Sequence, residues 1–311
     1  MRNSNMQREK IRFAMQRRTR RWQLYMMILP ALTFLILFAY KPMYGIVISF
    51  QDYNLWKGIS GSEWVGLRNF ERLFHSYWFP VIVKNTLTIS LLSLAIGFPM
   101  PIILALMTNE IGSQKIKGCF QTISYAPHFV STIVVCGMVI LFLNPTSGII
   151  NRLIVAVGGT ETFFMQKPGM FKWIYVLSGV WQNTGWSAII YVAALSGLDK
   201  QLLEAADIDG ASRFQKICYI NFPVLVPTIV ILFILQCGSI MNVGYEKVYA
   251  LQNSTNLQGS EVISTYVYKI GLEKQDFAFS TAVGLLNSVV NSVVLILANT
   301  ISRQVGQTGL W

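Results

Sequence analysis

Residues 204–223 read EAADIDGASRFQKICYINFP and lie between two long apolar segments. They form the most polar part of the second half of the chain. Strong helix formers precede Gly210, and glycine readily adopts the left-handed backbone conformation that often ends a helix. Asp199 is a suitable N-cap for the first helix, and Pro223 is expected to stop the second one. The stretch is therefore predicted to form two short helices that meet at Gly210.

The rest of the chain is strongly apolar. Of its 311 residues, 53% are hydrophobic and only 13% are charged, whereas soluble domains carry about 25% charged residues. Strands of a membrane barrel would alternate over about ten residues, and no such pattern is present. The composition predicts an all-α integral membrane protein. Its six expected spans cover about residues 22–50, 81–107, 120–143, 173–195, 227–241 and 279–301.

The positive charge is concentrated at the start of the chain. The formal net charge is +11, and residues 1–22 contribute +7 of it, with Glu9 as their one acidic residue. A basic cluster directly before an apolar segment holds a terminus in the cytoplasm, close to anionic lipid headgroups. Binding of nucleic acid is disfavoured, because the arm runs straight into a span. The basic residues are Arg2, Arg8, Lys10, Arg12, Arg17, Arg18, Arg20 and Arg21.

Six spans place both termini and the polar stretch on the side of the basic arm. The predicted organisation is a cytoplasmic arm (residues 1–22), one membrane domain (23–303) with a cytoplasmic loop at about 199–224, and a short cytoplasmic tail (304–311). The four cysteines form no Cys-x-x-Cys pair, and the two histidines lie far apart. No metal site is therefore expected.

The polar stretch resembles the EAA loop of permease subunits in bacterial ATP-binding-cassette (ABC) importers. The matching pattern is Glu-Ala-Ala, three residues, glycine, nine residues, isoleucine, one residue and Leu-Pro, with Phe222 in place of the leucine. Residues 64–70 (WVGLRNF), 244–247 (GYEK) and 309–311 (GLW) are similar to the LplB-type subgroup, which is associated with complex oligosaccharides. The resemblance covers nearly the whole chain and implies the six-helix type I permease architecture in the bacterial cytoplasmic membrane.

The resemblance also implies a division of labour among subunits. A second homologous permease, two ATPase subunits and an extracytoplasmic solute-binding lipoprotein would complete the transporter. ATP and magnesium would bind to the ATPase partners, since this chain has no Gly-x-x-x-x-Gly-Lys-Ser/Thr motif and needs no cofactor of its own. By motif position, the residues that would enter the ATPase cleft are Glu204, Ala205, Ala206, Asp209 and Gly210.

A set of amide, acidic and aromatic residues within or beside the spans is a candidate path for an oligosaccharide. Sugars offer hydroxyl groups to amides and carboxylates, and apolar faces to aromatic rings. Each residue alone is better explained by helix packing, and only the set indicates a path. Its members are Trp181, Gln182, Asn183, Trp186, Asn242, Tyr245, Glu246, Asn287 and Asn291.

Three other functions compete with sugar import. Permeases for amino acids or peptides also carry EAA loops. An integral-membrane enzyme would need paired carboxylates or a His/Asp set, and Glu246 is an isolated acid. A membrane scaffold or sensor could use the polar loop to bind a regulator without transporting anything. The identity, linkage and length of the sugar are not encoded in any recognisable motif.

Overall fold

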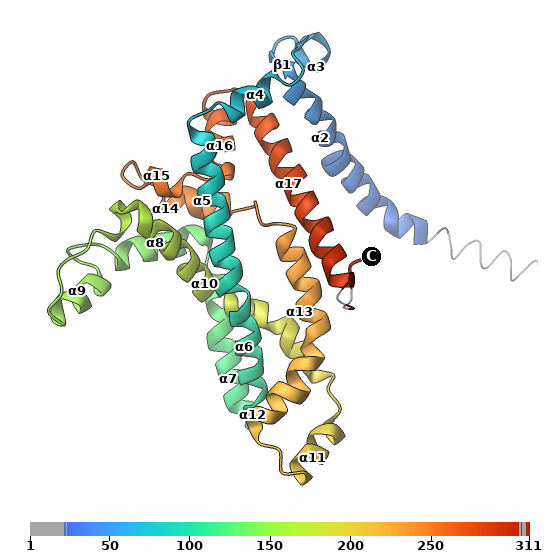
Figure 1. Cartoon of the computed structure of the whole chain (residues 1–311), viewed down its shortest axis with the longest axis vertical. Helices are drawn as coiled ribbons and strands as arrows, with labels where there is room; N and C mark the ends of the chain where they lie inside the picture. Colours follow the sequence, from blue (N-terminus) through green and yellow to red (C-terminus); the bar gives the residue numbers. More distant parts are fainter. Residues whose placement is uncertain (1–21, 23, 305, 307–308) are drawn as a thin grey trace, which may run out of the picture.

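A computed structural model describes residue 22, residues 24–304, residue 306 and residues 309–311. The described part is predominantly helical, in agreement with an all-α membrane protein. Figure 1 shows several of the helices running along one long axis, with α11 (Lys200–Ile208) at one end and β1 (Gln51–Asp52) with α3 (Gly58–Gly61) at the other. The basic residues 2–21 lie outside the described residues, so their role at the membrane surface stays a prediction.

Among the described residues, four helices are long and apolar enough to cross a bilayer. They are Leu24–Phe50, Trp78–Asn109, Arg213–Cys237 and α17 (Phe277–Gln304). Each overlaps one of the predicted spans. Within the first three, the elements are η1 (Ile36–Tyr40), α2 (Lys41–Met43), η2 (Tyr44–Phe50), α5 (Trp78–Leu92), η3 (Ser93–Gly97), α6 (Pro99–Asn109), α12 (Arg213–Lys216), η6 (Ile217–Asn221) and α13 (Phe222–Cys237).

The predicted third span is not a continuous helix. Residues Gln114–Phe129, which comprise α7 (Gln114–Tyr125) and η4 (Ala126–Phe129), meet α8 (Thr132–Phe142) at 96°. Val130 and Ser131 between them are extended, and the Ser131 hydroxyl accepts a hydrogen bond from the Val134 N–H at 3.4 Å, which caps α8. The bend therefore has a local cause in the extended pair and its cap.

The predicted fourth span is α10 (Pro168–Ser196), a single helix of 29 residues. At about 1.5 Å per residue it is long enough to cross a bilayer. Its polar residues set it apart from the four long apolar helices. Counting the bent pair as one span gives up to five in the described chain, so the expected number of six stays a prediction.

Pro223 does not stop the second helix of the polar stretch, and this prediction was wrong. The helix runs without interruption from Arg213 to Cys237. Proline lacks a backbone N–H and crowds the preceding turn, but Pro223 follows the wider π-helical turn of η6, and the Phe222 N–H bonds back to the Ile217 carbonyl. The wide turn accommodates the proline, so half of the predicted loop is part of a long helix.

Three buried clusters hold the helices together. One joins α5, α16 (Ile263–Tyr268) and α17, a second joins α8, α10 and α14 (Tyr245–Leu251), and a third joins α6, α10 and α13. Gly185 of α10 lies so close to α7 that a Cβ there would be 2.0 Å from the Ser124 carbonyl oxygen. Helix α10 is thus the central element to which both halves of the chain attach.

The end opposite α11 is closed by a small hairpin. Strand β1 pairs antiparallel with β2 (Glu63–Trp64), and Gln51 lies opposite Trp64. The Asn69 side chain donates to the carbonyls of Ser49 and Gln51 at 2.9 and 3.0 Å, which fixes the turn from the first helix. The remaining helices are α4 (Arg68–Phe74), α9 (Ile149–Ala156), η5 (Phe164–Gln166), α15 (Leu257–Ser260) and η7 (Lys269–Glu273).

Candidate functional site

Two helices meet at Gly210 as predicted, but only the first, α11, is short, because the second is the start of the long helix Arg213–Cys237. Asp199 caps α11, because its carboxylate accepts a hydrogen bond from the Gln201 N–H at 2.9 Å. Gly210 has φ of +74°, and the Ala211 N–H bonds to the Ala206 carbonyl at 2.9 Å. Only glycine adopts this conformation freely. The predicted cap and the predicted left-handed glycine are therefore both confirmed.

This helix pair presents a largely uncovered surface at the end of the molecule (Figure 1). Glu204, Ala205 and Asp209 are exposed, and Ala206 is half-buried. Large apolar side chains lie among them: Ile208 is 87% exposed and Phe214 is 74% exposed. Apolar side chains among charges at one end of a membrane protein are typical of a protein contact surface.

Two contacts link the two helices of the pair to each other and to the neighbouring long helices. The Lys216 ammonium lies 2.7 Å from an Asp207 carboxylate oxygen and joins α12 to α11 across Gly210. The buried Asn221 amide donates to the Glu110 carboxylate at 3.3 Å, at the end of α6. The two contacts connect α11 with α12, and the start of α13 with the end of α6.

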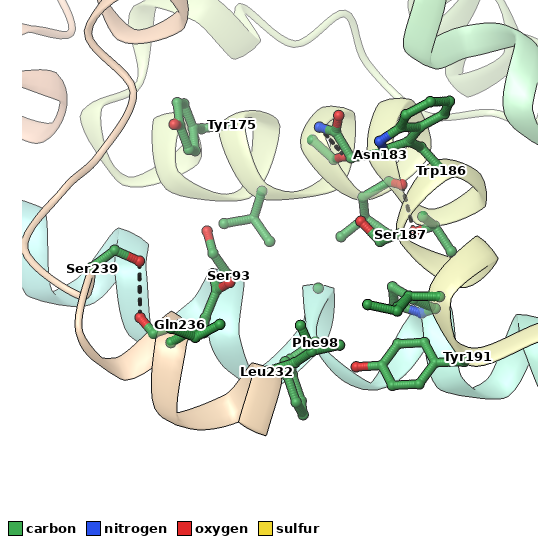
Figure 2. Close-up of a pocket in the computed structure, with 18 of the residues that line it drawn as sticks. Ser93, Phe98, Tyr175, Asn183, Trp186, Ser187, Tyr191, Leu232, Gln236 and Ser239 are labelled. Atoms are coloured by element: carbon green, nitrogen blue, oxygen red, sulfur yellow. Dashed lines mark hydrogen bonds between the residues drawn. The ribbon is translucent and has the colours of Figure 1, made fainter. Parts of the chain in front are cut away.

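A cavity of about 770 Å³ opens between α10 and the helices η3, α6 and α13. Figure 2 shows Asn183, Trp186, Ser187 and Tyr191 of α10 on one side of it, and Ser93 and Gln236 on the other. Its walls combine hydroxyl groups, amides and aromatic rings. These are the groups that bind the hydroxyl edges and the apolar faces of sugars.

A second cavity of about 720 Å³ lies where α7 and α8 bend apart. Gln182, Asn183, Tyr245 and Glu246 line it, and Asn183 also lines the first cavity. Four of the predicted path residues therefore meet here. The Gln182 amide donates to the Val130 carbonyl at 3.0 Å, so one of the four holds the bend itself.

An aromatic platform at the bend was not predicted from the sequence. The rings of His128 and Trp186 are stacked with their centroids 4.6 Å apart, and His128 Nδ1 donates to the Asn183 side-chain oxygen at 3.1 Å. In the sequence, His128 only follows Pro127 in an apolar context, which predicts a structural or interfacial role. Its partners lie 55 or more residues away, and no local pattern indicates such a pairing.

Lys247 is a second residue of the site that the prediction omitted. Its side chain is buried, with 7% exposed, and it lines both cavities. The ammonium donates to the Tyr175 carbonyl at 2.8 Å and lies 4.7 Å from the centre of the Tyr175 ring. Lys247 belongs to α14, which is not one of the long apolar helices. Burial lowers the pKa of its ammonium to about 8.

Three predicted path residues form a cluster of their own. The side-chain oxygen of Asn242 accepts hydrogen bonds from Asn287 at 2.9 Å and from Asn291 at 3.0 Å. Asn291 also accepts the Met241 N–H at 2.9 Å. These hydrogen bonds attach the segment between α13 and α14 to α17. None of the three asparagines lines the first cavity. Asn287 and Asn291 do share one helix face, as the spacing predicts.

Trp181 lies apart from the other α10 residues. It is 51% exposed and belongs to the wall of neither large cavity. Its participation in a path stays a prediction.

Comparison with known proteins gives the family. Residues 97–307 match the family described as binding-protein-dependent transport system inner membrane component. The chain belongs to this family. It is thus a permease component of the inner membrane, and the resemblance noted from the EAA loop is confirmed.

Relatives and a solved structure agree over nearly the full length. The polygalacturonan/rhamnogalacturonan transport system permease protein YteP of Bacillus subtilis (strain 168) is 44% identical, over 93% of this chain and 90% of its own. Protein LplB of the same organism is 38% identical over 93% and 91%. A chain of the bacterial alginate ABC transporter, solved with an alginate pentasaccharide-bound periplasmic protein, matches with a TM-score of 0.86 and 40% identity, over 94% and 98% of the two chains.

Proposed function

We propose that the chain is the permease subunit of an ATP-driven importer that passes an oligosaccharide from an extracytoplasmic binding protein into the cytoplasm. The observation that carries this proposal is the first cavity, which is lined by hydroxyl groups, amides and aromatic rings. All of its lining residues except Ser93 lie within the residues 97–307 that match the family. The relatives named for polygalacturonan/rhamnogalacturonan and alginate transport support it. Amino acids and peptides are disfavoured as cargo, because the described wall of this cavity includes no carboxylate to receive an ammonium group.

The membrane topology belongs to the same proposal. Six spans would consist of the four long apolar helices, the bent pair Gln114–Phe142 and α10. Both termini and α11 would then face the cytoplasm. With α11 in the cytoplasm, the exposed surface around Glu204 would seat in a cleft of an ATPase subunit that hydrolyses ATP with magnesium, and a second homologous permease would form a heterodimer with this chain.

The mechanism follows from the contacts of the helix pair. Closure of two ATPase subunits would move α11 and α12 together, because the hydrogen-bonded turn at Gly210, with the Ala211 N–H on the Ala206 carbonyl, connects them directly. The movement would reach α6 through Asn221 and Glu110, and α6 and α13 are both walls of the first cavity. The cavity would thereby open alternately to either side of the membrane.

The experiment is oligosaccharide uptake by the complete transporter, with Glu204→Ala as the test variant. Truncation of an interface hot spot costs about 2 kcal/mol or more. Glu204 is the proposed hot spot, so its replacement should lower both uptake and recovery of the ATPase with the chain at least about tenfold. Glu63→Ala is the matched control, since it removes an exposed carboxylate at the opposite end of the molecule. Normal ATPase recovery with Glu204→Ala would contradict the docking role, and absence of oligosaccharide uptake by the unaltered transporter would contradict the cargo.

A further inference from the structure

Lys247 is a buried cation without an acidic partner among the described residues. Three ion pairs occur in that part of the chain, and none of them includes Lys247. Lys269 offers the contrast, because its ammonium lies 2.6 Å from the buried Glu261 carboxylate. Burial of an unneutralised charge costs several kcal/mol. The protein offsets that cost at Lys247 only in part, through the Tyr175 carbonyl and ring.

The ammonium lies at the wall of a cavity that is otherwise uncharged. Lys247 is the one charged residue among the described residues that line the 770 Å³ cavity. Gly179 of α10 lies against the ammonium in the same wall, since a Cβ there would lie 3.1 Å from Nζ. The remaining polar wall residues are neutral amides and hydroxyl groups, such as Asn183, Gln236 and Ser187. A cargo in this cavity thus meets one positive charge and many neutral hydrogen-bonding groups.

We propose that Lys247 binds a carboxylate of the cargo and so makes the first cavity selective for oligosaccharides that contain uronic acids, the class to which the polygalacturonan and alginate of the relatives' names belong. The inference rests on the proposed import of an oligosaccharide and names its chemical class. One ammonium matches the single negative charge of a carboxylate, and the amides and hydroxyl groups match the sugar hydroxyls. A sugar phosphate carries a charge of about −1.5 to −2 at neutral pH and would keep an uncompensated charge beside Lys247.

Glu246 does not cancel this attraction. It is exposed and lines the second cavity at the bend, not the first. Lys247 lines both cavities, but the described wall of the first holds no acidic residue, so the cargo carboxylate is placed on that side. Because Gly179 lies against the ammonium, a larger residue at position 179 can weaken carboxylate binding while Lys247 keeps its charge.

The test compares uptake of tetragalacturonate with uptake of its methyl ester by the complete transporter. Each rate is divided by the rate of the unaltered transporter for the same cargo, so that the preference of the binding protein cancels. Lys247→Met keeps a side chain of similar length and removes its charge. It should lower uptake of the acid at least about tenfold, which corresponds to the free energy of one charge-assisted hydrogen bond. Uptake of the ester should change less than about twofold, and Lys247→Arg should keep most of the acid uptake.

A second variant controls for a structural role of Lys247. Gly179→Val retains the charge but crowds the ammonium, because its Cβ would lie 3.1 Å from Nζ, and it should lower uptake of the acid more than that of the ester. Equal loss for both cargoes in Lys247→Met, or unchanged acid uptake, would overturn the proposal. Transport of neutral oligosaccharides or of a sugar phosphate in place of the galacturonide would overturn the uronate assignment and leave the importer in place. Absence of uptake of every oligosaccharide would instead remove the proposed function.

Discussion

The helix pair around Gly210 and the cavity beside Lys247 are built in opposite ways. The helix pair consists of one short run of sequence, and its caps, turn and exposed side chains all lie within residues 199–216. The cavity is assembled from η3, α6, α10, α13 and α14, which are far apart in the chain. A surface that meets a partner can be local, whereas a space that holds a cargo requires helices from both halves of the molecule.

The largest effect is expected from Gly210→Val. Its φ of +74° is unfavourable for a β-branched residue by about 2 kcal/mol or more, although no atom lies within 4 Å of the new Cβ. The helix pair should therefore lose its shape, and ATPase recovery should fall about tenfold or more.

Gly210→Asn is the matched control, because asparagine tolerates the left-handed conformation. It should retain most of the ATPase binding. Equal recovery with valine and asparagine would show that the turn at Gly210 is not needed for docking.

Next in size is the effect of Gly185→Ala on stability. The new Cβ would lie 2.0 Å from the Ser124 carbonyl oxygen, so α10 must move away from α7. Overpacking of this kind costs about 1–3 kcal/mol. The thermal unfolding midpoint of the purified complex should fall by several degrees. Gly118→Ala on α7, where nothing lies within 4 Å, should leave the midpoint unchanged or raise it.

A smaller and more local effect is expected from Asn291→Ala. It leaves the buried Met241 N–H without its acceptor and removes one of two donors to Asn242, at a cost of about 1–2 kcal/mol. Uptake should fall several-fold while ATPase recovery stays normal. Asn287→Ala removes only one hydrogen bond to Asn242 and should have the weaker effect. If Asn291→Ala instead reduced recovery of the ATPase, the assignment of ATPase binding to the helix pair alone would be contradicted.

The smallest effect is expected from Asp207→Ala. Its carboxylate is 60% exposed, and exposed ion pairs contribute about 0–1 kcal/mol. Uptake should fall by less than about threefold at low salt, with no difference in 1 M salt, which screens the pair. Uptake that fell tenfold would mean that the contact with Lys216 has a larger role in transmission than its exposure indicates.

The two regions also differ in how far the sequence predicts them. The caps and the glycine turn of residues 199–210 follow from local chemistry, and they are confirmed. Pro223 was misread, since a π-helical turn lets the helix continue. The spacing of Asn287 and Asn291 predicts that they share one face of a helix, but it does not predict that both donate to Asn242. Lys247 and the His128–Trp186 stack depend on contacts across the fold that no periodicity encodes.

The central claim is that one end of the molecule receives an ATPase and the cavity receives the cargo. Cross-linking tests it most directly, with Ile208→Cys as the attachment point because that side chain is 87% exposed. The exposed Cys119 and Cys218 are first replaced by serine. In native membranes the account predicts a cross-linked ATPase subunit, identified by mass spectrometry, and its loss when Glu204→Ala is added. Recovery of the chain alone, or of an equal amount of ATPase with Glu204→Ala, would contradict the account.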